Sequence, residues 1–369
     1  MRTEELLRIA RRRKLDRVLV TDPANVRALT GVNCDNAVVE ATAGEEGAKG
    51  RKGPKGRKGR VAFYTDFRYV PMVHRVAPEL AVRDIRGLGN GKRGTGTVRR
   101  IGYESSIPHA RFLAWQKKFP KATFVDISKD LALMRAVKTP EEIAALRAAE
   151  SLDCEIWETA RGKFRAGMTE RQMALIIRKM MIEKGDGEAF ATIVCVGKNA
   201  AECHHEPDDT VWNGREPVLV DMGVKLNGFC SDLTRNLVPG LLDDARTSRQ
   251  ARPSSLYRRV YALVREANLA AIAAAKPGIT GRQLDKVARD VIRKGGFGKC
   301  FGHSLGHGVG YEVHEAPYAA KRDDTVLKPG MLVTIEPGVY LEDNLGVRIE
   351  DLVLITESGC EVLSATCGK

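Results

Sequence analysis

Histidine is rare in this chain of 369 residues, and most of it is concentrated in two short stretches. Three of the seven histidines lie between His303 and His314, in "GHSLGHGVGYEVHE", and two, His204 and His205, lie in "ECHHEP". Imidazole binds metals and transfers protons near neutral pH, so this clustering indicates ligands or proton-transfer groups. Alternatively, any one of these histidines could be a buried core residue whose nitrogens are hydrogen-bonded. Acidic residues elsewhere in the chain decide between this interpretation and a role as ligand or proton-transfer group.

Two acids belong to a predicted hairpin in "PVLVDMGVKLNGFCSDLTRNL". The dipeptide Asn227-Gly228 is a strong signal for a two-residue turn, because both positions of that turn need a positive φ. Such a turn places Asp221 and Asp232 on one face as diagonal neighbours, close enough to share a cation. The alternative is a pair of solvent-facing acids, but Asp221 ends the apolar run "VLVD" and is expected to point inward.

Two further acids lie in apolar strands near the C-terminus. Glu336 ends "MLVTIE", and Glu350 is expected inside the strand "GVRIEDLVLIT", with Arg348 two residues earlier on the same face. Buried carboxylates are costly unless they are paired or metal-bound. Four inward acids and His307 exceed the three protein ligands of one catalytic zinc and suit two divalent ions that share carboxylates. A carboxylate-rich set with one imidazole favours Mn²⁺ and also accepts Co²⁺, Fe²⁺ or Zn²⁺.

An internal repeat organises the elements that must position these residues. "GMTERQM" begins at Gly167 and "GITGRQL" begins at Gly278, and both place a threonine N-cap three residues before a glutamine. Each capping box predicts the start of a helix. Each helix is followed by a histidine, His204 or His314, and then by a strand that carries an acid. The order predicts two related halves packed about a pseudo-twofold axis.

The first part of the chain has a different organisation. Short apolar runs such as "DRVLVTD" and "RVAFYTD" alternate with helical patterns and predict a small α/β domain without a phosphate-binding glycine motif. A capped helix then begins at "KTPEEIAAL", where Thr139 is the expected N-cap and Glu142 completes a capping box. We therefore expect an N-terminal domain at 1–132 and a second domain at 133–369.

Composition excludes several classes of protein. No stretch of 18 apolar residues predicts a membrane span, and eight cysteines without a C-x-x-C pair indicate free thiols in a reducing cytoplasm. Much of the net charge of +13 comes from "GAKGRKGPKGRKGR" at 47–60. No aromatic residue is interleaved with this run, so we expect a solvated loop rather than a nucleic-acid site.

The motifs "DMGVKLNGFCSDLTR", "GHSLGHGVGYEVHE", "IEPGVY" and "GVRIED" resemble, in this order, those of the pita-bread metallopeptidases, which include methionine aminopeptidase, aminopeptidase P and prolidase. The resemblance covers most of residues 138–360. It implies a creatinase-like α/β N-terminal domain followed by an α+β pita-bread catalytic domain with internal pseudo-twofold symmetry. It also implies that two metal ions are held by five residues: Asp221, Asp232, His307, Glu336 and Glu350.

The same resemblance implies roles in catalysis and substrate binding. His204 and His314 match the family's two catalytic histidines, with His205 a poorer match than His204, and Glu336 is expected to shuttle a proton as well as bind metal. His303 and Arg348 resemble substrate-side residues of the proline-specific branch. The forms "HSLGH" and "GVRIED" separate this branch from the methionine aminopeptidases.

The function implied by the resemblance is metal-dependent hydrolysis of the Xaa-Pro bond at a free N-terminus, by a homodimer acting on short proline-containing peptides. Chain length and "HSLGHGVG" favour an Xaa-Pro dipeptidase of the prolidase kind. An Xaa-Pro aminopeptidase that takes longer peptides is the alternative. A non-catalytic module that binds peptides or nucleic acid is an alternative of another class, and five intact ligands argue against it.

Overall fold

The computed structural model describes residues 2–42, 59–88, 98–239 and 253–369. The chain forms two compact units, Met1–Arg135 and Ala136–Lys369, which divide three residues beyond the boundary expected from the sequence. No helix in these described ranges has the length and apolar character needed to cross a membrane. Most of the basic segment at 47–60, expected to be a solvated loop, lies outside the described residues.

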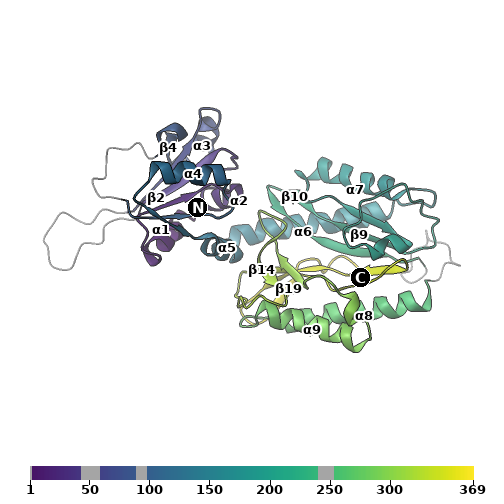
Figure 1. The fold of residues 1–369 in the computed structure, drawn as a ribbon. Coiled ribbons are helices and arrows are strands. Elements are labelled where there is room, and N and C mark those ends of the chain that lie inside the picture. Colours follow the sequence, from purple (N-terminus) through teal and green to yellow (C-terminus); the bar gives the residue numbers. More distant parts are fainter. Residues whose placement is uncertain (1, 43–58, 89–97, 240–252) are drawn as a thin grey trace. The chain divides into compact units, whose positions relative to one another are not determined.

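The N-terminal unit contains a six-stranded mixed sheet in the order β4-β3-β2-β1-β5-β6 (Figure 1). Its strands are β1 Arg17–Val20, β2 Ala37–Thr42, β3 Arg60–Thr65, β4 Ala81–Asp84, β5 Arg100–Tyr103 and β6 Thr123–Asp126. Its helices are α1 Thr3–Arg12, α2 Pro23–Thr30, α3 Val70–Val76, the 3₁₀ turn η1 Ile85–Gly87, α4 His109–Lys118 and α5 Ser128–Ala136, which ends at the division between the units. The short apolar runs of the sequence form the strands, as an α/β domain requires.

The second unit contains two pairs of long helices around several small sheets. Its helices are α6 Pro140–Arg161, α7 Glu170–Lys184, α8 Ser255–Ala274 and α9 Gly281–Lys294, with 3₁₀ turns η2 Gly197–Ala201 and η3 Gly298–Cys300. The strands of its first half are β7 Gly187–Glu188, β8 Ile193–Val196, β9 Val218–Met222, β10 Val224–Leu226, β11 Phe229–Cys230 and β12 Leu233–Leu237. Those of its second half are β13 Gly306–Gly308, β14 Glu315–Ala319, β15 Leu332–Ile335, β16 Gly338–Leu341, β17 Leu345–Arg348, β18 Asp351–Ile355 and β19 Cys360–Val362.

The two halves of this unit repeat one plan. Helices α6 and α7 lie on one side of the strands, and α8 and α9 lie on the other (Figure 1). Thr169 and Thr280 cap α7 and α9 with complete capping boxes. Each threonine also forms an isolated bridge with a later segment, Thr169 with Val211 and Thr280 with Val326. The predicted pseudo-twofold organisation is therefore confirmed.

The predicted hairpin is also confirmed. Leu226 pairs with Phe229 across a turn in which Asn227 and Gly228 both have positive φ. The same register continues into the next sheet, where Asp221 pairs with Thr234, so Asp221 and Asp232 lie near each other on neighbouring segments. Local turn chemistry thus sets the positions of two candidate ligands.

One strand prediction was wrong. "GVRIEDLVLIT" forms two strands, β17 and β18, rather than one, and Glu350 lies in the break between them. The break arises because β17 pairs with β16 in a two-stranded sheet, whereas β18 pairs with β15 in a different sheet. Glu350 therefore lies where the chain passes from one sheet to the next.

Candidate metal centre

Three of the five predicted ligands form a tight group at the ends of strands from both halves. Ligand atoms of Asp232, His307 and Glu350 all lie within 4.8 Å of one another. Asp232 lies between β11 and β12, His307 lies in β13, and Glu350 lies between β17 and β18. Segments far apart in the sequence thus bring two carboxylates and one imidazole to a single point.

The orientation of His307 leaves one ring nitrogen available to a metal. Its Nδ1 lies 3.1 Å from the carbonyl oxygen of Gly308, which can only accept a hydrogen bond, so Nδ1 carries the proton. Nε2 then points towards Oδ2 of Asp232 at 3.6 Å and Oε1 of Glu336 at 3.3 Å. Burial lowers the pKa of His307, but the hydrogen bond with Glu336 outweighs it and raises this pKa, so a metal ion would replace a proton on Nε2. Without that proton, His307 has the tautomer that a metal-binding histidine needs.

A glycine beside His307 permits this placement. A Cβ at Gly306 would lie 1.9 Å from the carbonyl oxygen of Thr334, so only glycine lets β13 approach β15 this closely. The backbone N–H of His307 donates to Oγ1 of Thr334 at 3.0 Å, and Thr334 also donates to Glu336 at 3.2 Å. Thr334 therefore positions both residues at once.

The carboxylates around His307 are buried close to one another, which makes a nearby cation favourable. Burial, followed by the charges of neighbouring carboxylates, raises the pKa of Asp232 and of Glu350 well above its ordinary value. Burial also raises the pKa of Asp221, whose Oδ1 is buried without a hydrogen-bond partner. At Glu336 burial acts in the same direction, but the hydrogen bond and charge of His307 outweigh it and lower the pKa. Buried carboxylates that repel one another fit divalent cations, so the residues present suit the predicted metals.

The two predicted substrate-side residues are joined by a third that the sequence reading did not single out. Nη1 of Arg348 donates to the hydroxyl of Tyr340 at 2.8 Å, and this hydroxyl lies 2.9 Å from Nε2 of His303. Nδ1 of His303 donates to the carbonyl of Ser304 at 2.8 Å, so Nε2 accepts from Tyr340. Burial lowers the pKa of His303, which keeps the imidazole neutral. The last residue of "IEPGVY" was the available signal for Tyr340.

Thr234 links the substrate-side residues to the ligands. Its Oγ1 donates to Oε2 of Glu350 at 2.7 Å and accepts from Nε of Arg348 at 3.1 Å. Nη2 of Arg348 also lies 2.5 Å from Oδ2 of Asp221. Arg348 therefore contacts a predicted metal ligand as well as the substrate-side group.

His204 and His314, the predicted catalytic histidines, are both exposed. The ring centroid of His314 lies 4.2 Å from that of His307 at an interplanar angle of 74°. Burial lowers the pKa of His314, and the charges of His307 and, more weakly, His204 act in the same direction. The structure thus places an exposed imidazole beside the candidate metal ligands, with a second close enough to influence it.

Two buried acids behind the centre were missed. The backbone N–H of Asp232 lies 3.4 Å from Oε2 of Glu150, and Ser231 donates to Asp153 at 2.8 Å. Both acids of α6 are fully buried, and burial raises both pKa values well above the ordinary range. A carboxylate among the apolar residues of the helix that Thr139 begins was the signal that could have found Glu150.

A second group of possible ligands comprises Glu170, His205 and Asp208. Hydrogen-bond donors already satisfy both oxygens of the Glu170 carboxylate, which accepts from Val196 N, Asn199 Nδ2, His205 Nε2 and Asp208 N. A buried carboxylate with four donors does not need a metal ion, so we regard this group as a hydrogen-bonded cluster.

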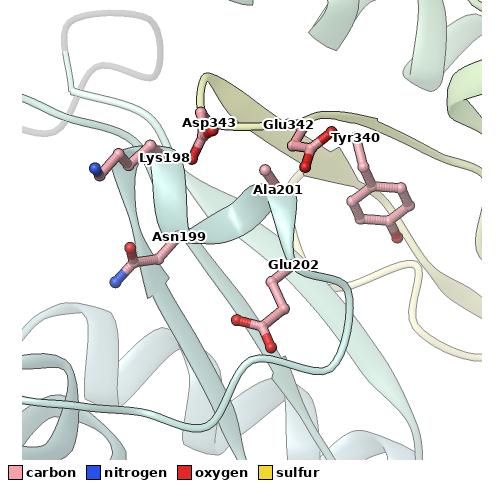
Figure 2. Close-up of a pocket in the computed structure, with 7 residues that line it drawn as sticks. All are labelled: Lys198, Asn199, Ala201, Glu202, Tyr340, Glu342 and Asp343. Carbon is pink, nitrogen blue, oxygen red and sulfur yellow. The ribbon is translucent and has the colours of Figure 1, made fainter.

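A pocket of about 510 Å³ lies where η2 meets the turn between β16 and β17 (Figure 2). Its lining combines one lysine with three acids and Tyr340; the residues are Lys198, Asn199, Ala201, Glu202, Tyr340, Glu342 and Asp343. Tyr340 belongs to both this pocket and the group formed with His303 and Arg348, so the pocket borders the predicted substrate side.

Comparison with known proteins supports the same fold and chemistry. Residues 2–137 match the Creatinase/Prolidase N-terminal domain, and residues 144–357 match Metallopeptidase family M24. The Xaa-Pro dipeptidase of Lactobacillus helveticus is 40% identical over 264 residues, which cover 71% of this chain and 68% of that protein.

Solved structures agree over nearly the whole chain. The prolidase from Pyrococcus horikoshii has a TM-score of 0.85 at 29% identity and covers 98% of this chain and 97% of its own. The X-Pro aminopeptidase from Thermotoga maritima has a TM-score of 0.82 at 29% identity, and the match covers 99% of this chain and 97% of that enzyme. The predicted creatinase-like and pita-bread domains are confirmed, and the chain belongs to metallopeptidase family M24, with a creatinase/prolidase N-terminal domain.

Proposed function

We propose that this chain is an Xaa-Pro dipeptidase that uses two divalent metal ions to cleave the bond before proline at a free N-terminus. The observation that carries the proposal is the convergence of Asp232, His307 and Glu350 within 4.8 Å, in a site where burial and neighbouring carboxylates raise the pKa of Asp232 and of Glu350. Relatives named Xaa-Pro dipeptidase support the choice of substrate.

The metal ligands proposed are the five predicted from the sequence: Asp221, Asp232, His307, Glu336 and Glu350. Their oxygen-rich composition favours Mn²⁺, with Co²⁺, Fe²⁺ and Zn²⁺ as alternatives. When bound, divalent cations supply a Lewis acid for the scissile carbonyl and make water a better nucleophile at neutral pH.

Proton transfer and charge stabilisation fall to residues of this chain. Glu336 lies 3.3 Å from Nε2 of His307, and a carboxylate at this position could take a proton from the attacking water. It would then deliver this proton to the leaving proline nitrogen. The exposed imidazoles of His314 and His204 would donate hydrogen bonds to the carbonyl oxygen as negative charge develops on it.

Recognition of proline would fall to the group His303, Tyr340 and Arg348. Proline has no backbone N–H when it is peptide-bonded, so an enzyme that selects it must bind the ring and the carboxylate instead. Arg348 supplies a cation for a carboxylate, and its bond to Tyr340 fixes the guanidinium. The neutral His303 ring offers a flat surface beside it.

An Xaa-Pro aminopeptidase acting on longer peptides is the second candidate. It is favoured by the similarity to the Thermotoga maritima enzyme and by the pocket lined in part by Tyr340, which offers space next to the predicted substrate side. The predicted homodimer, the cytoplasmic location and the domain limits 1–132 and 133–369 stay predictions.

The proposal is tested by loading the purified chain with Mn²⁺ and following hydrolysis of Ala-Pro, Ala-Pro-Ala and Met-Ala-Ser. We expect cleavage of Ala-Pro, slower or no cleavage of Ala-Pro-Ala, and none of Met-Ala-Ser. Efficient cleavage of the tripeptide Ala-Pro-Ala would instead identify the aminopeptidase. Cleavage of Met-Ala-Ser alone would refute both proline-specific functions.

A further inference from the structure

The residue that follows each of the two predicted catalytic histidines is buried in an ion pair. His205 follows His204, and its Nε2 lies 2.7 Å from Oε2 of Glu170. Glu315 follows His314 and contacts Nζ of Lys138. Both pairs are almost completely shielded from solvent, whereas the two histidines that precede them are exposed. The internal repeat relates His204 to His314, so both halves anchor equivalent positions with different side chains.

In the first half, Glu170 ties the start of α7 to the whole segment around His204. Its carboxylate accepts from the backbone N–H of Val196 at 2.6 Å and from Nδ2 of Asn199 at 2.9 Å, before the histidine. It also accepts from Nε2 of His205 at 2.7 Å and from the N–H of Asp208 at 3.1 Å, after the histidine. One fixed carboxylate therefore sets the path of residues 196–208.

In the second half, the anchor is built into the glycine-rich motif. A Cβ at Gly310 would lie 2.3 Å from Oε1 of Glu315 and 2.9 Å from Nζ of Lys138. Glycine at this position therefore leaves the space that the ion pair occupies. Glu315 is also buried at the first position of β14, whereas His314, in the bend that precedes this strand, is exposed.

We propose that the pairs Glu170–His205 and Lys138–Glu315 are positioning devices that aim His204 and His314 at the substrate. The inference rests on the catalytic role proposed above for these two histidines. A hydrogen bond that stabilises a transition state depends on placement to within a fraction of an ångström, and an exposed side chain on an unanchored loop would not keep such placement. Residues 205 and 315 thus act through their neighbours and do not touch the substrate.

The test is a double-mutant cycle in the full chain. His205→Phe keeps the ring volume but removes both donors, and His205→Gln keeps a donor near the position of Nε2. We expect His205→Phe to lower kcat for Ala-Pro by at least about 10-fold and to leave KM little changed. The loss should not exceed the roughly 10²–10³-fold decrease that follows removal of a transition-state donor itself. His205→Gln should restore much of the rate. In a His204→Ala background, His205→Phe should cause no further loss.

The matched control is Asp209→Asn, which removes an exposed ion pair between Arg171 of α7 and the residue directly after the anchored segment. This variant should retain wild-type kcat. Equal losses from His205→Phe in the His204 and His204→Ala backgrounds would overturn the proposal, because His205 would then act independently of His204. A failure of His205→Gln to recover more rate than His205→Phe would also count against it.

Hydrogen exchange separates this proposal from the proposed function. Amides of residues 197–207 should exchange faster in His205→Phe than in the wild type or in Asp209→Asn, whether or not the chain cleaves any peptide. Unchanged exchange in this segment would refute the anchor itself. If His205→Phe exchanges faster in this segment but the wild-type chain does not cleave Ala-Pro, the anchor is supported and the dipeptidase function is refuted.

Discussion

Nη2 of Arg348 lies 2.5 Å from Oδ2 of Asp221. The residue expected to face the substrate therefore also holds a predicted metal ligand, whose other oxygen is buried without a partner. Both side chains are shielded from solvent, so the contact is a buried ion pair rather than a weak surface one. Arg348 thereby couples the metal centre to the side of the site that would hold proline.

Substitution Arg348→Met should impair metal binding as well as catalysis. It removes the cation that orients Asp221 and the donor to Tyr340, and loss of such an outer partner typically costs about 10–100-fold in metal affinity or activity. Isothermal titration with Mn²⁺ and kcat/KM for Ala-Pro measure the two effects. Arg282→Met, which breaks an exposed pair with Asp324, is the control. If Arg348→Met binds Mn²⁺ as tightly as the wild type does, Arg348 contributes to substrate binding and not to metal binding.

Asp232→Asn and Glu350→Gln should each raise the stability of the metal-free chain and lower its metal binding and activity. Each change removes a buried negative charge from a mutually repelling group, so the melting temperature of the metal-free chain should rise. Each also removes a ligand, so bound metal and activity should be mostly lost. Differential scanning calorimetry, metal analysis and an Ala-Pro assay on one preparation test this. Two bound ions with normal turnover would refute the assignment of these ligands.

Removal of metal should destabilise the wild-type chain. A ligand that binds only the folded state stabilises it by about 2.7 kcal/mol at a concentration 100 times its Kd, and chelation removes this contribution. We expect the melting temperature of the second unit to fall on addition of a chelator and to recover on addition of Mn²⁺. Asp232→Asn should show a much smaller response. If neither the chelator nor Mn²⁺ changes the melting temperature of the wild-type chain, the proposed metal site binds no metal.

The pair formed by His205 and Glu170 should make stability depend on pH. Burial lowers the pKa of His205, but hydrogen bonds to Glu170 and Glu202, with the charge of Asp208, outweigh it and raise the pKa above 6.5. The folded state therefore binds this proton more tightly than the unfolded state. The stabilisation is complete below pH 6.5 and is lost as pH rises through the raised pKa.

Denaturant unfolding of the wild type and His205→Gln at pH 5.5 to 9 measures this dependence. The stability advantage of the wild type over the variant should be largest at the acid end and should shrink as pH rises. An advantage that stays constant, or that grows with pH, would show that His205 is not held as a cation.

Most of what the sequence predicted correctly depends on local chemistry. The turn at Asn227-Gly228, the capping boxes at Thr169 and Thr280, and the burial of Asp232 each follow from a few adjacent residues. The resemblance to a family then grouped five ligands, and the structure brings Asp232, His307 and Glu350 together.

What the sequence did not show depends on contacts between distant segments. Glu150 reaches the backbone of Asp232 across 82 residues, and Glu170 reaches His205 across 35. The break at Glu350 exists because two flanking strands join different sheets, and no alternation pattern within the segment encodes that. Such features follow from tertiary packing, which overrides local periodicity.

The most direct test of the account compares two histidines whose rings lie 4.2 Å apart. Bound metal and kcat for Ala-Pro are measured on the same samples of wild type, His307→Ala and His314→Ala. His307→Ala should lose both metal and activity, because it removes a ligand. His314→Ala should keep its metal, lose about 10²–10³-fold in kcat and change KM little. If His314→Ala loses the metal while His307→Ala retains it, or if both variants turn over normally, the metal-dependent Xaa-Pro peptidase described here is contradicted.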